Sequence, residues 1–216
     1  MSGIRLVVFD LGGVMVRIVR SWGDAHEAAG LEPERVPTSE RFESERSRLA
    51  HAYQTGAVGT DDYFAAMADA SGGAYTADEI RRVLHAWMYG EYEGVGRVVD
   101  ALESAGVEMA ALSNTNAYHW EMLRSDGPTP AFPTVARLKT AFASHVVGAA
   151  KPEAAIFEAL ERETDVSGES ILFFDDVEPY VAAARKVGWR AERIDPAGDT
   201  AAQMLGHLKR YGVIGR

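Results

Sequence analysis

The chain has 216 residues, of which 47% are apolar, and its formal net charge is -10. This length suits one large domain or a domain with an inserted module, and the apolar fraction is enough for a substantial core. The negative charge argues against a nucleic-acid partner, because binding to a phosphate backbone needs cationic side chains. No apolar run approaches the ~20 residues of a membrane span, so we expect no membrane partner.

The absence of cysteine excludes thiolate metal sites and suits a reducing compartment. The first residues lack the charged and apolar regions of a secretory signal. We therefore expect a cytoplasmic protein. The sequence leaves its oligomeric state open between a monomer and a homodimer.

The first predicted element is a buried strand over Ile4–Phe9, which is apolar except at Arg5. It leads directly into Asp10 and then into a turn at Gly12 and Gly13. In an open α/β sheet, ligands bind at the carboxyl ends of the strands, so this carboxylate is suited to nucleophilic or metal chemistry. A helix N-cap or turn aspartate is the alternative interpretation.

A long segment with a helical pattern follows, from about Val19 to Tyr89. Thr76–Glu79 matches a capping box ahead of apolar residues at helical spacing, and Thr60 is a predicted N-cap. We interpret residues 15–92 as a small helical cap inserted after the first strand. The alternative is a set of crossover helices in one continuous fold, but a crossover rarely needs so many residues.

From Val95 onward, predicted helices and strands alternate, with a Pro-containing loop from Ser125 to Pro133. Strands joined by helices imply a mostly parallel, doubly wound, Rossmann-like α/β sheet. We assign this core domain to residues 1–14 and 93–216. The predicted helices are Val95–Ala105, Glu153–Glu163 and Ala201–Tyr211, and the predicted strands are Val107–Leu112, Ala141–Ser144, Ile171–Phe174 and Arg190–Ile194.

Polar residues follow several of these strands. The strand ending at Phe174 leads into Asp175 and Asp176, as the first strand leads into Asp10. Two carboxylates about 4 Å apart repel by roughly 4 kcal/mol at an effective dielectric constant of ~20, so a cation must offset them if these strand ends meet. Either a divalent ion or a lysine could supply that charge, and an oxygen-only cluster favours Mg²⁺.

Four motifs follow one another along the chain, and they are Phe9–Val14, Leu112–Asn116, Lys151-Pro152 and Phe173–Asp176. In this order they resemble the motifs of the haloacid dehalogenase-like hydrolase superfamily. The resemblance covers nearly the whole chain and is closest to bacterial sugar-phosphate phosphatases related to the α-glucose-1-phosphate phosphatases. It implies a Rossmann-like core with a small helical cap inserted after the first motif.

The resemblance implies a role for each motif residue. Asp10 matches the nucleophile, which would form an aspartyl-phosphate, and Ser113 matches the hydroxyl that binds a phosphoryl oxygen. Lys151 matches the lysine that neutralises the nucleophile and the phosphate together. Asn114 would shape the pocket through its backbone N–H, and Asn116 would touch the substrate.

The same resemblance implies a Mg²⁺ site. Its expected ligands are Asp10, the backbone carbonyl of Gly12 and Asp176, while Asp175 would ligate or support the metal. Gly12 and Gly13 would also border the substrate. The implied partner is a small phosphorylated metabolite, with sugar phosphates favoured.

Two positions depart from the family pattern. Most phosphatases of this superfamily have an aspartate two residues after the nucleophile, which acts as a general acid and base, but here that residue is Gly12. His119, which follows the second motif, is a candidate replacement, or a surface or capping histidine. Tyr180 stands where relatives often have Asn or Asp, and would weaken support of the metal.

Two other functions remain open at this point. A 2-haloacid dehalogenase shares the aspartate nucleophile and needs no metal, but it requires an arginine near the halide, and the sequence cannot place Arg17, Arg20 or Arg41 there. A weakly catalytic phosphate-binding protein is the third possibility.

The inserted segment contains several aromatic residues, which we expect mainly in its core, with one or two facing the site. They are Trp22, Phe42, Tyr53, Phe64, Trp87 and Tyr89. Tyr118 and Trp120, next to the second motif, are candidates to line the site.

Overall fold

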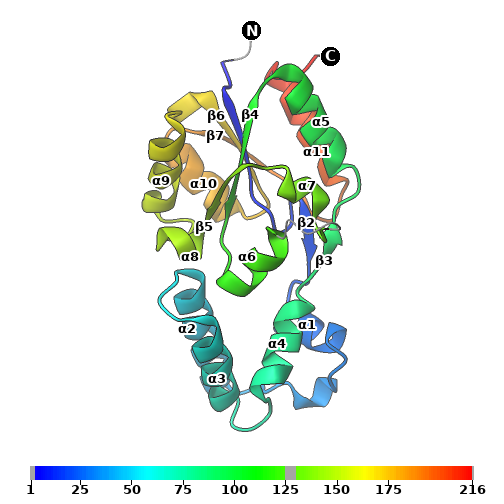
Figure 1. Cartoon of the computed structure of the whole chain (residues 1–216), viewed down its shortest axis with the longest axis vertical. Helices are drawn as coiled ribbons and strands as arrows, with labels where there is room; N and C mark the ends of the chain where they lie inside the picture. Colours follow the sequence, from blue (N-terminus) through cyan, green and yellow to red (C-terminus); the bar gives the residue numbers. More distant parts are fainter. Residues whose placement is uncertain (1–2, 125–129, 216) are drawn as a thin grey trace.

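The computed structural model describes residues 3–124 and 130–215. Its centre is a five-stranded parallel sheet in the order β5-β4-β1-β6-β7 (Figure 1). The predicted Rossmann-like α/β class is confirmed, and each predicted strand is present within a few residues. The strands are β1 (Leu6–Phe9), β4 (Glu108–Ser113), β5 (Thr140–Ala143), β6 (Ile171–Asp175) and β7 (Arg190–Arg193).

The central strand β1 is buried on both faces, as is typical of parallel sheets covered by helices. Leu6 and Val8 belong to one apolar cluster, and Val7 and Phe9 belong to another on the opposite face. Helices α5 (Val95–Ala105) and α11 (Thr200–Arg210) contribute to the Phe9 cluster. Helices α9 (Ala154–Thr164) and α10 (Glu178–Lys186) contribute to the other, so the sheet lies between two helical layers (Figure 1).

Short elements complete this part of the chain. They are α6 (Ala117–Leu123), α7 (Pro133–Ala136), α8 (Ser144–Val147) and the 3₁₀ turn η2 (Gly168–Ser170). The predicted loop from Ser125 to Pro133 lies largely outside the described residues, and its last residue begins α7.

Four helices lie beyond one end of the sheet and have an apolar cluster of their own (Figure 1). They are α1 (Trp22–Ala28), α2 (Glu40–Gln54), α3 (Thr60–Ala70) and α4 (Ala77–His85), with the 3₁₀ turn η1 (Pro33–Arg35) between α1 and α2. The predicted capping box at Thr76 is present. The N-cap of α3 is Gly59 rather than Thr60, and the Thr60 hydroxyl instead accepts a hydrogen bond from Tyr53 at 3.0 Å.

A two-stranded antiparallel ladder connects these helices to the sheet. It pairs β2 (Val16–Ile18) with β3 (Met88–Glu91), so the prediction of helical structure as far as Tyr89 is wrong at that end. The two strands are too short to show an alternating pattern, and each depends on a partner far along the chain. None of the helices in the described ranges is both long and apolar enough to span a membrane.

Candidate active site

The strand register brings the predicted motifs to one edge of the sheet. Phe9 pairs with Phe174 on one side of β1 and with Ala111 on the other. The backbone N–H of Asp10 donates to the Phe174 carbonyl at 2.8 Å. The residues that follow these pairs therefore lie side by side, which places Asp10 between Asp175 and the end of β4.

Lys151 lies at the centre of this edge with a fully buried side chain. Its Nζ donates to the Leu112 carbonyl at 3.0 Å and to Asp175 Oδ2 at 2.6 Å, and it lies 3.0 Å from Asp10 Oδ1. These contacts match the three donors of an ammonium group. Burial opposes the charge, but Asp10 and Asp175 outweigh it and raise the pKa of Lys151.

The three predicted carboxylates form one cluster. Asp10, Asp175 and Asp176 each offer an oxygen, and these oxygens lie within 4.8 Å of one another. Burial raises the pKa of Asp10 to about 7, with Lys151 opposing that rise and the two neighbouring aspartates adding to it. A second cation beside Lys151 would lower the pKa and stabilise the ionised cluster.

The donor set fits Mg²⁺, which prefers oxygen ligands. Asp175 is the least free of the three, because its Oδ2 binds Lys151 and its Oδ1 accepts the Val177 N–H at 2.8 Å. Asp10 and Asp176 both line the cavity above the sheet edge, whereas Asp175 does not. Asp175 therefore holds Lys151, and Asp10 and Asp176 have the carboxylates best placed for an ion.

Arg20 also belongs to this site, although the sequence could not place it there. Its Nη1 lies 2.6 Å from Asp176 Oδ2, and it lines the same cavity as Asp10. Arg20 follows β2, the short strand that the sequence pattern did not reveal. Arg17 instead lies over the ring of Tyr89, at 5.1 Å from its centre, and Arg41 is exposed.

The two glycines of the first motif differ in position. Gly13 has a φ of 84°, and a Cβ there would lie 2.5 Å from Asp176 Oδ2, so a side chain would collide with this carboxylate. Gly12 lines the cavity, and a Cβ there would lie 3.0 Å from Ile18 Cδ1. Gly13 thus allows the close approach of Asp176 and is not among the residues that line the cavity.

In the second motif, Leu112–Asn116, the side chains of Asn114 and Asn116 hold neighbouring backbone groups in place. The Asn114 side chain donates to the Lys151 carbonyl at 2.9 Å and accepts the Lys151 N–H at 2.8 Å, which fixes the lysine backbone. Asn116 is the N-cap of α6, and its Oδ1 accepts the His119 N–H at 3.0 Å. Ser113 is buried and lines the cavity, and no described residue hydrogen-bonds to its hydroxyl.

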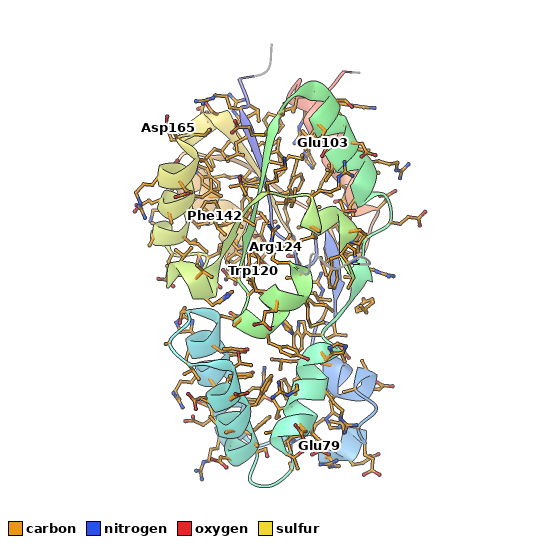
Figure 2. The ribbon with its side chains drawn as sticks, viewed as in Figure 1. Glu79, Glu103, Trp120, Arg124, Phe142 and Asp165 are labelled. Atoms are coloured by element: carbon orange, nitrogen blue, oxygen red, sulfur yellow. The ribbon has the colours of Figure 1, made fainter. Side chains whose placement is uncertain are left out.

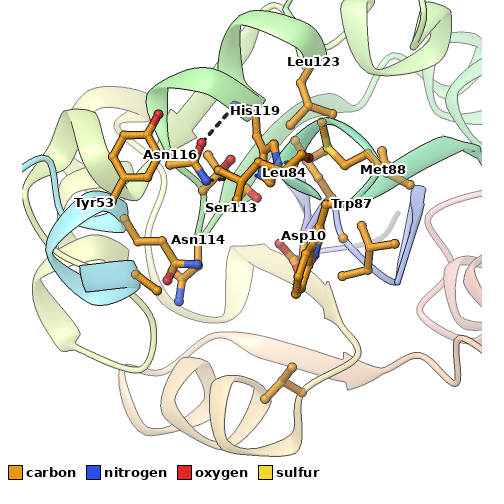
Figure 3. A pocket seen from close by; sticks show the side chains of 18 of the residues that line it. Asp10, Tyr53, Leu84, Trp87, Met88, Ser113, Asn114, Asn116, His119 and Leu123 are labelled. Carbon is orange, nitrogen blue, oxygen red and sulfur yellow. Dashed lines mark hydrogen bonds between the residues drawn. The ribbon is translucent and has the colours of Figure 1, made fainter. Parts of the chain in front are cut away.

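The cavity lies between this sheet edge and the helical segment and has a volume of about 350 Å³ (Figure 3). Its walls include four of the aromatic residues of the helical segment, which are Trp22, Tyr53, Tyr63 and Trp87. Phe42 and Phe64 are buried in the cluster of that segment, as expected. Tyr118 and Trp120 do not line the cavity, and the Tyr118 N–H donates to the Tyr53 hydroxyl at 3.1 Å.

Residues 4–188 match the family described as haloacid dehalogenase-like hydrolase. The chain belongs to this hydrolase family. A curated phosphatase of Mycobacterium tuberculosis is 38% identical over 71 residues, a match that covers 33% of each chain. The hydrolase thus spans about a third of the length of that relative.

Solved structures share the fold of this hydrolase. A haloacid dehalogenase family enzyme of Bacteroides thetaiotaomicron has a TM-score of 0.76 at 19% identity, covering 93% of this chain and 98% of that one. The same enzyme has been crystallised with magnesium and inorganic phosphate. A dehalogenase has a TM-score of 0.61 at 18% identity, covering 89% of this chain and 85% of that one.

His119 of the hydrolase is engaged on both ring nitrogens (Figure 3). Its Nε2 lies 2.8 Å from the Leu84 carbonyl, which only accepts, so Nε2 carries the proton and Nδ1 accepts from the Asn116 amide at 3.2 Å. Burial lowers the pKa of His119 to about 4. A neutral imidazole with a hydrogen bond on each ring nitrogen is poorly suited to donate a proton to a leaving group. His119 therefore joins α6 to α4 rather than replacing the missing aspartate.

Tyr180 also differs from the expectation based on the family. It lines the cavity, and its ring centre lies 5.2 Å from Lys151 Nζ. A lysine ammonium at this distance is attracted to the electron-rich face of the ring. Tyr180 therefore stabilises the buried lysine instead of contributing an amide or carboxylate near the cluster of aspartates.

Proposed function

We propose that this hydrolase is a Mg²⁺-dependent phosphatase that acts on a small phosphorylated metabolite, with sugar phosphates favoured, through an aspartyl-phosphate on Asp10. The observation that carries the proposal is the buried Lys151, which bridges Asp10 and Asp175 beside a cavity that Asp10, Asp176 and Ser113 line. A carboxylate can approach an anionic phosphate only where cations offset the repulsion, and this arrangement supplies one of them.

In the proposed reaction, the Asp10 carboxylate attacks phosphorus and the bond from phosphorus to the leaving oxygen breaks. Water then hydrolyses the acyl phosphate and restores Asp10. Lys151 offsets charge on Asp10, and the Ser113 hydroxyl donates to a phosphoryl oxygen. Asp10, the Gly12 carbonyl and Asp176 would hold Mg²⁺, which would supply positive charge to offset the repulsion of nucleophile and phosphate. Asp175 supports the site by holding Lys151.

The leaving group is expected to depart with little help from a general acid. Gly12 has no side chain, and the His119 ring is committed to Leu84 and Asn116. Substrates whose alcohol or hemiacetal oxygen leaves readily, such as anomeric phosphates, would suffer least from this lack. We also propose that residues 15–92 act as a cap domain over a core of residues 1–14 and 93–216, with the aromatic walls of the cavity enclosing the leaving group.

The test is phosphate release from a panel of sugar phosphates and a chromogenic aryl phosphate, with Mg²⁺ and with EDTA. We expect release that depends on Mg²⁺, is lost in EDTA and varies among the sugar phosphates. Release that is equal in EDTA would contradict the metal requirement. An absence of release from every substrate would contradict the phosphatase.

A dehalogenase is the second candidate, because Arg20 lines the cavity beside Asp10, where a halide would need a cation. The contact of Arg20 with Asp176 argues against a free halide site. Chloride release from 2-chloropropionate that is insensitive to EDTA would favour this reaction over phosphate release. Binding of inorganic phosphate without turnover of either substrate would instead favour a phosphate-binding protein.

A further inference from the structure

Arg46 of α2 lines the cavity from the helical side and has an unsatisfied donor. Its Nε is buried and has no hydrogen-bond partner among the described residues. Buried polar atoms nearly always have a partner, because an unmet donor loses its bond to water without replacement. The Arg46 side chain as a whole is 24% exposed and lines the cavity, so a cation whose donors are not all satisfied stands in the cavity wall.

The rest of the Arg46 guanidinium contacts an exposed glutamate and an aromatic ring of the cavity wall. Nη2 lies 2.6 Å from Glu43 Oε2, and the Glu43 side chain is 48% exposed. Exposed ion pairs of this kind contribute little energy, so Glu43 does not fully compensate the charge of Arg46. The guanidinium carbon also lies 5.7 Å from the centre of the Trp22 ring, which fixes the side chain at the cavity wall.

Arg48, on the same helix, provides an internal comparison. It forms the same type of pair with a glutamate three residues earlier, at 2.9 Å from Glu45, but its side chain is 64% exposed and does not line the cavity. The pairing with a glutamate therefore does not explain the position of Arg46. What distinguishes Arg46 from Arg48 is its place in the cavity wall and its orphaned Nε.

The charges of the cavity have a clear distribution. The carboxylates of Asp10 and Asp176 line it from the sheet edge, and Arg20 is paired with Asp176. Among the described residues of α1 to α4, Arg46 is the one charged residue that lines it. A substrate with its phosphoryl group at Asp10 would thus present the remainder of the molecule to a wall that has aromatic rings and one guanidinium.

We propose that Arg46 is a specificity-determining residue that binds a second anionic group of the substrate, a carboxylate or a second phosphate. This inference rests on the proposed function, since it assumes that Asp10 receives the phosphoryl group. The planar guanidinium suits both anions, because its N–H groups match paired oxygens. The preferred substrates would then be phosphate esters of acids, or bisphosphates, of a size that a cavity of about 350 Å³ can hold.

The test is calorimetric binding of unhydrolysable alkylphosphonates in the presence of Mg²⁺. Compounds of matched chain length would end in a methyl, a carboxylate or a second phosphonate. We expect a compound of suitable length that ends in a carboxylate or a second phosphonate to bind the wild-type protein about tenfold to a hundredfold more tightly than its methyl counterpart. This is the range for hydrogen bonds to charged groups. The carboxylate and phosphonate series distinguish the two anions.

Arg46→Gln should reduce this preference to nearly one, and Arg48→Gln should retain it. Arg46→Lys, which keeps the charge but not the planar donors, should fall between them. Equal binding of methyl and anionic compounds by the wild-type protein, or an unchanged preference in Arg46→Gln, would overturn the inference. The wild-type comparison decides even if a variant does not fold, and because no turnover is needed, a failure of the proposed phosphatase reaction is detected separately by phosphate release.

Discussion

At Lys151, one ammonium group separates two buried carboxylates, and this makes the residue important for stability as well as chemistry. We expect Lys151→Met to destabilise the protein by about 3–5 kcal/mol, because Asp10 and Asp175 would lose their shared counter-charge in a buried setting. Urea unfolding followed by circular dichroism would measure the change. Lys139→Met, at an exposed lysine, is the control and should change stability little; an equal loss in both variants would contradict this account of Lys151.

Burial of the His119 imidazole, which lowers its pKa, should make the stability of the protein depend on pH. Its pKa is about 4 in the folded protein but near 6.5 when unfolded, so the unfolded chain binds more protons between these values. The contribution is complete above pH 6.5 and is lost as the pH falls toward 4, with a total of about 3 kcal/mol. Unfolding free energies of His119→Gln should therefore fall less than those of the wild type between pH 7 and pH 4.5.

His51→Gln is a matched control for this measurement, since His51 is an exposed histidine on α2. It should retain the wild-type pH dependence. If His119→Gln also retained it, the buried imidazole would not be its source.

The residues that the sequence could predict are those whose position follows directly from a strand end. Asp10, Ser113, Asp175 and Asp176 each end or immediately follow a strand, so the register of a parallel sheet suffices to bring them together. Arg46 lies on a helix whose orientation depends on packing within the helical segment. The bonds that commit His119 to Leu84 and Asn116 likewise depend on how α4 meets α6.

Among the elements, α4 illustrates how a local signal in the sequence becomes stability. The Thr76 hydroxyl accepts the Glu79 N–H at 3.2 Å, and Glu79 Oε2 accepts the Thr76 N–H at 2.9 Å. Glu79 also pairs with Arg35 at 2.7 Å, at the end of the helical segment far from the sheet (Figure 2). The cap thus links the start of α4 to η1.

Thr76→Ala should destabilise the protein by about 1 kcal/mol, because it leaves the Glu79 N–H in the first turn of α4 without its acceptor. Thermal unfolding would measure the loss, and Thr76→Ser, which keeps the hydroxyl, should retain most of the stability. A similar loss in both variants would indicate that the methyl group of Thr76 matters rather than its hydroxyl.

Element prediction succeeded where a pattern was long or locally capped and failed where pairing was remote. The capping box of α4 and the apolar strands of the sheet were readable from neighbouring residues. The β2 and β3 strands have three and four residues, and α1 to α4 separate them in the sequence. Arg20 was therefore unplaced, because its contact with Asp176 depends on the ladder that they form.

At the scale of the whole molecule, the cavity joins chain segments from the sheet edge and from the helices. Asp10, Asp175 and Asp176 carry one more charge than Lys151 and Arg20 together offset, so a bound divalent cation should stabilise the folded state. At a concentration of Mg²⁺ 100 times its dissociation constant, the gain would be about 2.7 kcal/mol. Thermal unfolding should therefore shift upward with added Mg²⁺ and return to its starting value with EDTA.

Asp176→Asn should weaken that shift strongly, because Asp176 is proposed as a principal ligand. Glu169→Gln is the control, since Glu169 is an exposed carboxylate away from the cavity. An equal upward shift in wild type and Asp176→Asn would mean that Mg²⁺ binds elsewhere.

The central claim is that Asp10 transfers the phosphoryl group, and the most direct measurement compares phosphate release by wild type and Asp10→Asn with Mg²⁺ present. The asparagine is nearly the same size but is a far weaker nucleophile, so the cavity and Lys151 remain in place. The account predicts turnover by the wild type and a loss of at least about a thousandfold in Asp10→Asn. Phosphate release that continues undiminished in Asp10→Asn would contradict it.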